Sequence, residues 1–169
     1  MKKFIFIAII SAAAMVLSCG PRLIEGTTIA DNDTNRAILK VFQEYAQAFQ
    51  EKNADKIVKN VSEKYYDPNG TDQADDDVDY NGIKTFLNSA EFKEIVRIEP
   101  IFVLKELTVE GDKAKLLFFF EARYKGKDET TPARKSVLND SNEKWEKVSD
   151  INIMMLQKEK DGWKIISGI

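Results

Sequence analysis

Apolar residues recur at three- and four-residue steps after residue 33, a spacing that predicts an amphipathic helix. Asp33 or Thr34 is suited to cap its start. Its apolar stripe consists of Ile38, Val41, Phe42, Tyr45, Ala48 and Phe49. A shorter helix is predicted after Asn53, and a third one is predicted to begin near Asn81-Gly82. The first half of the folded region is therefore expected to be mostly helical.

The residues between the second and third helices indicate a short strand and a turn. Ser62 to Tyr66 is interpreted as the strand. Asp67-Pro68-Asn69-Gly70 follows it, and this segment predicts a turn because proline and glycine stop a strand while asparagine favours the turn. An acidic loop, Asp72 to Asp79, then leads to the third helix.

Alternation of apolar and polar residues after about Ile95 predicts an antiparallel sheet. Glu110-Gly111-Asp112 and Lys160-Asp161-Gly162 are expected to form hairpin turns. Pro100 predicts an edge strand or a bulge, because proline cannot donate to a strand ladder. One face of the strand that follows the first turn is apolar throughout and is expected to pack on the helices: Ala114, Leu116, Phe118, Phe120, Ala122 and Tyr124.

The opposite face of that strand carries Leu117 and Phe119, on the side that a single layer of helices would leave in water. A later strand is also apolar on both faces, through Ile151, Ile153, Met154, Met155 and Leu156. This pattern predicts a homodimer that covers the outer face of the sheet. The alternative is that the segment from Thr130 to Trp145 folds back over the same surface.

The N-terminus has the layout of a secretory signal: Lys2 and Lys3, an uncharged stretch from Phe4 to Leu17, and then Val16-Leu17-Ser18-Cys19. The uncharged stretch is shorter than the roughly twenty residues that a membrane-spanning helix needs. The junction resembles the lipobox of bacterial lipoproteins, which implies cleavage before Cys19 and acylation of its thiol. A lone cysteine near an ordinary cleavage site, or a buried thiol, is the alternative.

This interpretation divides the chain into a signal peptide (1–18), an acylated tether (19–33) and one folded domain (34–169). The protein is then expected in the cell envelope, anchored to a membrane through Cys19. Gly20 follows the cysteine in place of aspartate, which indicates the outer membrane, facing the periplasm, if the organism is Gram-negative.

Charge and composition exclude several classes of function. Removal of Lys2 and Lys3 changes the formal net charge from −3 to −5, and the remaining lysines are scattered among acids, so a nucleic-acid partner is not expected. The chain has no histidine, which excludes serine–histidine and cysteine–histidine catalysis and any zinc site that needs imidazole. Cys19 is the only cysteine, so no disulfide forms within the chain.

Three helices, a short strand before the third, and a long antiparallel sheet resemble the NTF2-like cone of SnoaL-like proteins and ketosteroid isomerases. The resemblance covers about Asn35 to Ile169. Its local carriers are YAQAFQEKNADKIV (45–58), YDPNG (66–70), Asn81-Gly82 and KDGWKI (160–165). It implies an α+β, cystatin-like fold in which three N-terminal helices pack on a curved antiparallel sheet.

The resemblance also implies candidate site residues. Tyr45 matches a tyrosine that polarises a carbonyl, and Asp67 matches an aspartate that moves a proton. Asn152 stands where these isomerases normally have a protonated aspartate, with Asp150 two residues away. The pocket is expected to be lined by Phe118, Phe120, Tyr65 and Trp163. The alternative roles are structural: Tyr45 as a core residue, and Asp67 as an acceptor within its turn.

The acidic loop lacks the spacing of an EF-hand, because Tyr80 or Asp72 stands where glycine is required, so no metal or other cofactor is expected. The favoured function is non-catalytic binding of a small apolar ligand or an envelope protein. The second hypothesis is an isomerase- or lyase-like enzyme that acts on a carbonyl substrate through Asp67 and Tyr45. The third is a structural assembly protein whose cone is filled by Phe118, Phe120 and Trp163.

Overall fold

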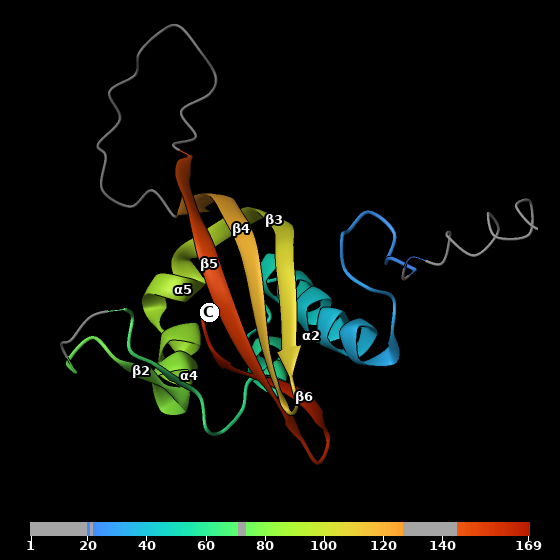
Figure 1. Cartoon of the computed structure of the whole chain (residues 1–169). Helices are drawn as coiled ribbons and strands as arrows, with labels where there is room; N and C mark the ends of the chain where they lie inside the picture. The colour runs from blue at the N-terminus through green and yellow to red at the C-terminus, as the bar shows by residue number, and fades with distance from the viewer. Residues whose placement is uncertain (1–19, 21, 71–73, 127–144) are drawn as a thin grey trace, which may run out of the picture.

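The computed structural model describes residue 20 and residues 22–70, 74–126 and 145–169. It is an α+β structure in which helices cover one face of a four-stranded antiparallel sheet of order β3-β4-β5-β6 (Figure 1). A second, two-stranded sheet pairs β1 with β2. The elements are α2 (Asp33–Gln50), α3 (Ala54–Asn60), β1 (Tyr66–Asp67), β2 (Val78–Asp79), α4 (Tyr80–Asn88), α5 (Ala90–Glu94), β3 (Ile95–Glu110), β4 (Lys113–Gly126), β5 (Glu146–Glu159) and β6 (Gly162–Ser167).

The three predicted helices are confirmed, but the first is capped by Asn32, whose side chain accepts from the Asn35 backbone at 2.8 Å. The caps predicted at Asp33 and Thr34 are wrong, because both residues already lie inside the helix. A fourth short helix, α5, was not predicted. It begins at the cap residue Ser89, whose hydroxyl accepts from the Phe92 backbone at 3.1 Å, and it is too short to show helical periodicity.

The predicted strand from Ser62 to Tyr66 is placed too early, because β1 begins only at Tyr66. The Ser62 hydroxyl accepts from the Lys64 backbone at 3.0 Å and donates to Glu159 at 2.7 Å, and these bonds hold a turn in place of a strand. The turn that follows β1 is confirmed, with Asn69 and Gly70 both at positive φ.

The two predicted hairpins form β3–β4 and β5–β6. Antiparallel pairing of β4 with β5 joins them into the four-stranded sheet. Pro100 lies on β3, an edge strand, as its missing N–H predicts. The register shifts of β3 fall between Ile95 and Arg97 and between Leu104 and Glu106. The irregularities are therefore near Pro100 but not at it.

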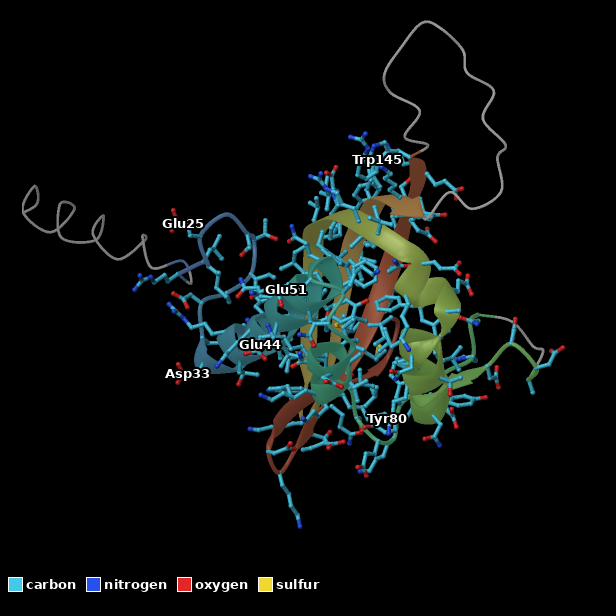
Figure 2. The ribbon with its side chains drawn as sticks, turned by 180° about the vertical axis from the view of Figure 1, so that it is seen from behind. Glu25, Asp33, Glu44, Glu51, Tyr80 and Trp145 are labelled. Atoms are coloured by element: carbon cyan, nitrogen blue, oxygen red, sulfur yellow. The ribbon has the colours of Figure 1, made fainter. Side chains whose placement is uncertain are left out.

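The expected inner face of β4 packs on α2. The ring centroids of Phe118 and Phe42 lie 5.1 Å apart, and those of Phe120 and Phe49 lie 5.7 Å apart. Figure 2 shows from behind how the helices lie over the sheet. The buried hydrophobic residues of the described chain all fall between Ile29 and Ile165. The described core thus extends from Ile29, before α2, to Ile165 on β6.

The described part of the expected tether is not extended. Leu23 pairs with Ala30 in an isolated bridge, and Ile29 is buried in the core. Arg36 donates to Asp31 at 2.8 Å, which ties this segment to the first turns of α2. Burial of one apolar side chain and this ion pair together hold the segment against the domain.

Cys19, the predicted signal peptide and residues 130–144 of the proposed cover lie outside the described residues. Among the residues that the structure describes, no helix is both long and apolar enough to cross a membrane.

Candidate functional site

A cavity of about 460 Å³ lies between α2, the turn after β1 and the inner face of the sheet. We call it the main cavity. Three of the predicted site residues line it together, namely Tyr45, Asp67 and Asn152. Its full lining is Tyr45, Phe49, Asp67, Asn69, Phe102, Phe118, Phe120, Asp150, Asn152, Ile153, Gly168 and Ile169.

Tyr45 comes from α2 and is only 7% exposed. Its hydroxyl has no hydrogen-bond partner among the described residues. In that part of the chain, every fully buried side-chain polar atom has a partner, so the Tyr45 hydroxyl must be accessible from the cavity. Burial raises the pKa of the Tyr45 phenol above its usual range, with a smaller electrostatic contribution from Tyr65. Tyr45 therefore stays protonated and offers the cavity a free donor.

Asp67, in contrast, accepts three hydrogen bonds from the protein. Its Oδ1 accepts from the Asn69 backbone at 3.0 Å. Its Oδ2 accepts from the Gly168 backbone at 2.7 Å and from the Tyr65 hydroxyl at 3.2 Å. Asp67 thus fastens β1 to the residues that follow β6. This arrangement gives the carboxylate a structural role as an anchor.

Asn152 lies on β5 opposite Phe118 of β4 and contributes its side chain to the main cavity. Its amide has no hydrogen-bond partner within the described part of the chain, so it can donate to or accept from a ligand. Asp150 also lines the main cavity, and its Oδ1 accepts from the Ile151 backbone at 2.7 Å. Among the described lining residues, Tyr45 and Asn152 thus have side chains without a hydrogen-bond partner, and Asp150 has one carboxylate oxygen without a partner.

Aromatic rings form much of the remaining wall. Phe118 and Phe120 line the cavity as expected. Phe102 of β3 was missed, although its ring lies 5.1 Å from that of Phe120 and 6.1 Å from that of Tyr45. The alternation along β3, which places Phe102 and Leu104 on one face, is a signal that could have identified it.

Two residues expected in the pocket lie elsewhere. Tyr65 is buried and is not part of the cavity lining; its hydroxyl lies within reach of two acceptors for its one proton, Asp67 Oδ2 at 3.2 Å and the Ile169 carbonyl at 3.3 Å. Trp163 is buried in the core and is not part of the cavity lining. It lies on the short strand β6, whose inner face packs under α2 and α3 and not toward the cavity. The predictions for these two residues are therefore corrected.

A second cavity of about 280 Å³, which we call the side chamber, adjoins the main cavity. The two cavities share Tyr45, Phe49 and Ile169. The rest of the side chamber comes mainly from α3, β2 and α4: Ile57, Asp77, Val78, Gly82, Ile83, Phe86 and Leu87. No sequence pattern predicted it, because its walls come from three separate segments.

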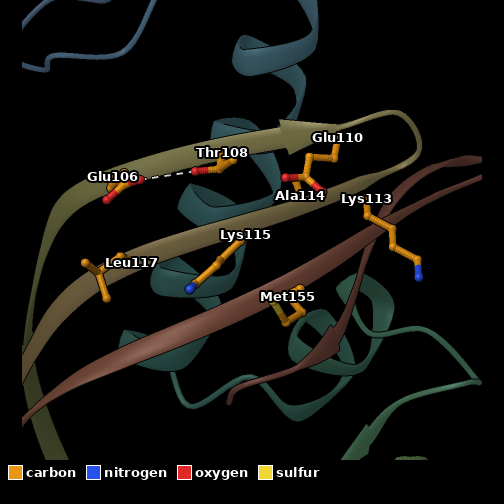
Figure 3. A pocket seen from close by; sticks show the side chains of 8 residues that line it. All are labelled: Glu106, Thr108, Glu110, Lys113, Ala114, Lys115, Leu117 and Met155. Carbon is orange, nitrogen blue, oxygen red and sulfur yellow. Dashed lines mark hydrogen bonds between the residues drawn. The ribbon is translucent and has the colours of Figure 1, made fainter.

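The outer face of the sheet has a shallow hollow of about 380 Å³ (Figure 3). Charged residues of both signs surround it, among them Glu106, Glu110, Lys113 and Lys115, and Leu117 and Met155 supply apolar surface. The Thr108 hydroxyl donates to Glu106 at 3.2 Å. This hollow lies on the opposite side of the sheet from the main cavity.

The acids of the predicted loop have local roles where the structure describes them. Asp79 caps α4 by accepting from the Gly82 backbone at 2.7 Å, and Asp77 accepts from the Tyr66 hydroxyl. Asp72 lies outside the described residues. Within the described part of the chain, no group of three or more acidic, cysteine or histidine residues is placed to hold a metal ion.

No family model matches the sequence, and no curated protein matches it either. Solved structures do match. A ketosteroid isomerase-like protein from Erwinia carotovora atroseptica superposes with a TM-score of 0.57 at 16% identity, over 82% of this chain and 98% of that one. A hexachlorocyclohexane dehydrochlorinase from Novosphingobium barchaimii superposes with a TM-score of 0.58 at 9% identity, over 79% and 82% of the two chains.

A member of the NTF2-like family from Streptomyces avermitilis, with a proposed dehydratase activity, superposes with a TM-score of 0.57 at 11% identity, over 80% of this chain and 93% of that one. These identities are low, so the similarity concerns the fold. Helices on one face of a curved antiparallel sheet, with a cavity between the two layers, agree with it. The chain has the NTF2-like fold.

Proposed function

We propose that this protein is an envelope lipoprotein whose NTF2-like domain binds a small apolar ligand that carries a hydrogen-bond acceptor. The observation that carries this proposal is the Tyr45 hydroxyl: it belongs to an otherwise buried side chain, has no partner among the described residues, and is accessible from an aromatic cavity. An acceptor on a ligand would receive a hydrogen bond from this hydroxyl inside the cavity.

The properties of the main cavity support binding. Its volume of about 460 Å³ falls within the usual range for small-molecule sites. Phe102, Phe118 and Phe120 offer apolar surface, and Tyr45 and Asn152 offer a small number of hydrogen-bonding groups. Such a combination of apolar walls and few polar groups is typical of specific ligand sites.

The alternative function is an isomerase- or lyase-like enzyme that uses Asp67 as a base and Tyr45 as an electrophile on a carbonyl substrate. The ketosteroid isomerase-like and dehydrochlorinase structures share this fold and motivate the alternative. Both oxygens of Asp67 already accept hydrogen bonds from the protein, and Asn152 is not an acid. Three hydrogen bonds leave Asp67 about one of its four acceptor sites for a substrate, so these contacts favour binding over catalysis.

Calorimetric titration of residues 20–169 with an unsaturated cyclic ketone, and with the hydrocarbon of the same shape, tests the binding proposal. The ketone should bind more tightly, and Tyr45→Phe should weaken ketone binding by roughly 2- to 10-fold without affecting the hydrocarbon. Equal affinities for both compounds would contradict the role of Tyr45. Turnover of the ketone that Asp67→Asn abolishes would favour the enzyme.

Anchoring through acyl chains on Cys19 belongs to the same proposal. The signal layout and the Val-Leu-Ser-Cys junction support it, and two or more acyl chains on one residue give stable membrane attachment. Cys19→Ser should move the protein from the membrane fraction to the soluble fraction. Retention of that variant in the membrane would contradict the assignment. Fractionation of inner and outer membranes tests the outer-membrane location in a Gram-negative host.

We also propose that the domain forms a homodimer through the outer face of its sheet. Ile151 and Ile153 of β5 are 63% and 43% exposed, and Ile101 and Val103 of β3 are 52% and 40% exposed. Phe119 pairs with both Val103 and Ile151, so these side chains form one patch across three strands. Charges of both signs around the patch would complement a second copy. A patch of this kind is uncommon on a free monomer.

A further inference from the structure

The main cavity and the side chamber share three lining residues, Tyr45, Phe49 and Ile169. A ligand that contacts these residues in the main cavity therefore lies beside the side chamber. Only Ile169 of the three comes from outside α2, and Tyr65 holds its backbone N–H at 3.2 Å.

The linings of the two cavities differ in chemistry. Beyond the shared residues, the main cavity presents the rings of Phe102, Phe118 and Phe120, which suit a flat or cyclic apolar group. The side chamber presents mostly aliphatic side chains, Ile57, Val78, Ile83 and Leu87, with Phe86 at its exposed rim. Asp77 is its only charged lining residue, and it already accepts a hydrogen bond from Tyr66. A flexible alkyl chain suits this chamber.

The free donor lies where the two cavities meet. Tyr45 lines both cavities, and its phenol is close enough to Tyr65 to interact with it electrostatically. The Tyr65 hydroxyl is engaged by Asp67 and Ile169, which leaves Tyr45 as the donor that a ligand can use there. An acceptor on the ligand therefore belongs between its cyclic part and its chain.

Resting on the proposed ligand-binding function, we propose that the ligand is an elongated molecule in which an apolar ring and an alkyl chain are joined at a hydrogen-bond acceptor. The ring occupies the main cavity, the chain occupies the side chamber, and the acceptor accepts a hydrogen bond from the Tyr45 hydroxyl. The volume of the side chamber then limits the length of the chain.

Alkyl phenyl ketones of increasing chain length test this directly, because their carbonyl stands between a ring and a chain. Affinities of acetophenone, butyrophenone, hexanophenone and octanophenone for residues 20–169 are measured by calorimetry. Affinity should rise about fourfold for each added methylene, the value for burial of one CH₂ (about 0.8 kcal/mol), until the chamber is full. A rise could also come from non-specific adsorption, so variants of the chamber are needed.

Val78→Phe fills the side chamber from a half-buried position, and it should remove the dependence of affinity on chain length. Val58→Phe is the matched control, because Val58 is also half-buried but lines a different cavity, and it should keep the full dependence. Circular dichroism establishes that both variants fold. Should Val78→Phe not fold, Phe86→Trp at the exposed rim takes its place.

Three results separate the outcomes. Chain-length dependence that Val78→Phe removes and Val58→Phe keeps supports the proposal. Acetophenone binding that responds to Tyr45→Phe but shows no chain-length dependence overturns the two-chamber ligand and leaves the proposed function standing. If no ketone binds and Tyr45→Phe changes nothing, the proposed binding function itself fails.

Discussion

The backbone N–H of Gly168 donates a 2.7 Å hydrogen bond to Oδ2 of Asp67, across a sequence separation of 101 residues. This bond joins the short strand β1 to the segment after β6, and both residues line the main cavity. The end of the sheet is thereby fixed against the turn that follows β1. The shape of the cavity thus depends on a contact between β1 and the C-terminal segment of the domain.

Gly168→Ala should destabilise the domain on the order of 3 kcal/mol. Its φ is +90°, and a Cβ at this position would lie 1.8 Å from the Ile153 carbonyl oxygen. Gly111→Ala is the control, because Gly111 also has a positive φ but no atom within 4 Å of the added Cβ, and it should cost about 1–2 kcal/mol. Urea unfolding measures both. Equal losses would show that the approach to Ile153 relaxes at little cost.

Asp67→Asn should lower the free energy of unfolding by about 1–3 kcal/mol, because an amide cannot accept all three hydrogen bonds. Asp150→Asn is the matched control in the same cavity. Asp150 is exposed and accepts only from its neighbour Ile151, so its loss should stay within about 0.5 kcal/mol. An Asp67→Asn variant of unchanged stability would argue against the anchor and in favour of a catalytic role.

Phe118→Ala should cost about 3–5 kcal/mol in thermal or chemical unfolding, the range for a buried phenylalanine. Phe118 is 2% exposed, and its ring packs on those of Phe42 and Phe102 at 5.1 and 5.9 Å. The variant also enlarges the main cavity, so a bulky apolar ligand should restore part of the lost stability. A loss below about 1 kcal/mol would contradict the observed register of β4.

Sedimentation of residues 20–169 at micromolar concentration should show a dimer, and Phe119→Glu should convert it to a folded monomer. The introduced carboxylate would be buried without a partner between two apolar sheet faces. Leu23→Glu is the control, because Leu23 is 49% exposed but lies outside the sheet, and it should leave the dimer intact. A wild-type domain that is monomeric at every accessible concentration would favour a cover from its own residues 130–144.

Alkaline pH should destabilise the protein through its buried phenols. Burial raises the pKa values of Tyr45 and Tyr65 above the unfolded value of 10.0, so both ionise first in the unfolded chain. Their contribution is complete below pH 10 and is lost as the pH rises toward the folded-state pKa values. Tyr45→Phe should make this decline shallower by up to about 1.4 kcal/mol per pH unit. Unfolding curves recorded on both sides of pH 10 measure this decline. If the wild type and Tyr45→Phe lost the same stability per pH unit, the assignment would be contradicted.

Local patterns in the sequence determined most of the secondary structure. The spacing of Ile38, Phe42 and Tyr45 predicted α2, and the glycine turns at Gly111 and Gly162 predicted the two hairpins. These signals involve residues a few positions apart, so the chain itself carries them. The absence of histidine likewise excluded whole classes of catalysis, because a missing side chain is missing in every conformation.

The composition of the site was decided by tertiary structure. Tyr45, Asp67 and Asn152 come together only because α2, β1 and β5 meet at one cavity. Phe102 joins them from the edge strand, whereas Trp163 packs into the core instead. A sequence pattern specifies which face of an element is apolar, but not which partner that face meets.

Asp67 illustrates the same limit. Its place before a proline indicated a turn acceptor, and the Asn69 bond agrees with that. Its bonds to Gly168 and Tyr65 depend on where β6 ends in space. Folding brings together donors that are distant in sequence, and those donors decide whether a carboxylate acts as an anchor or remains available as a base.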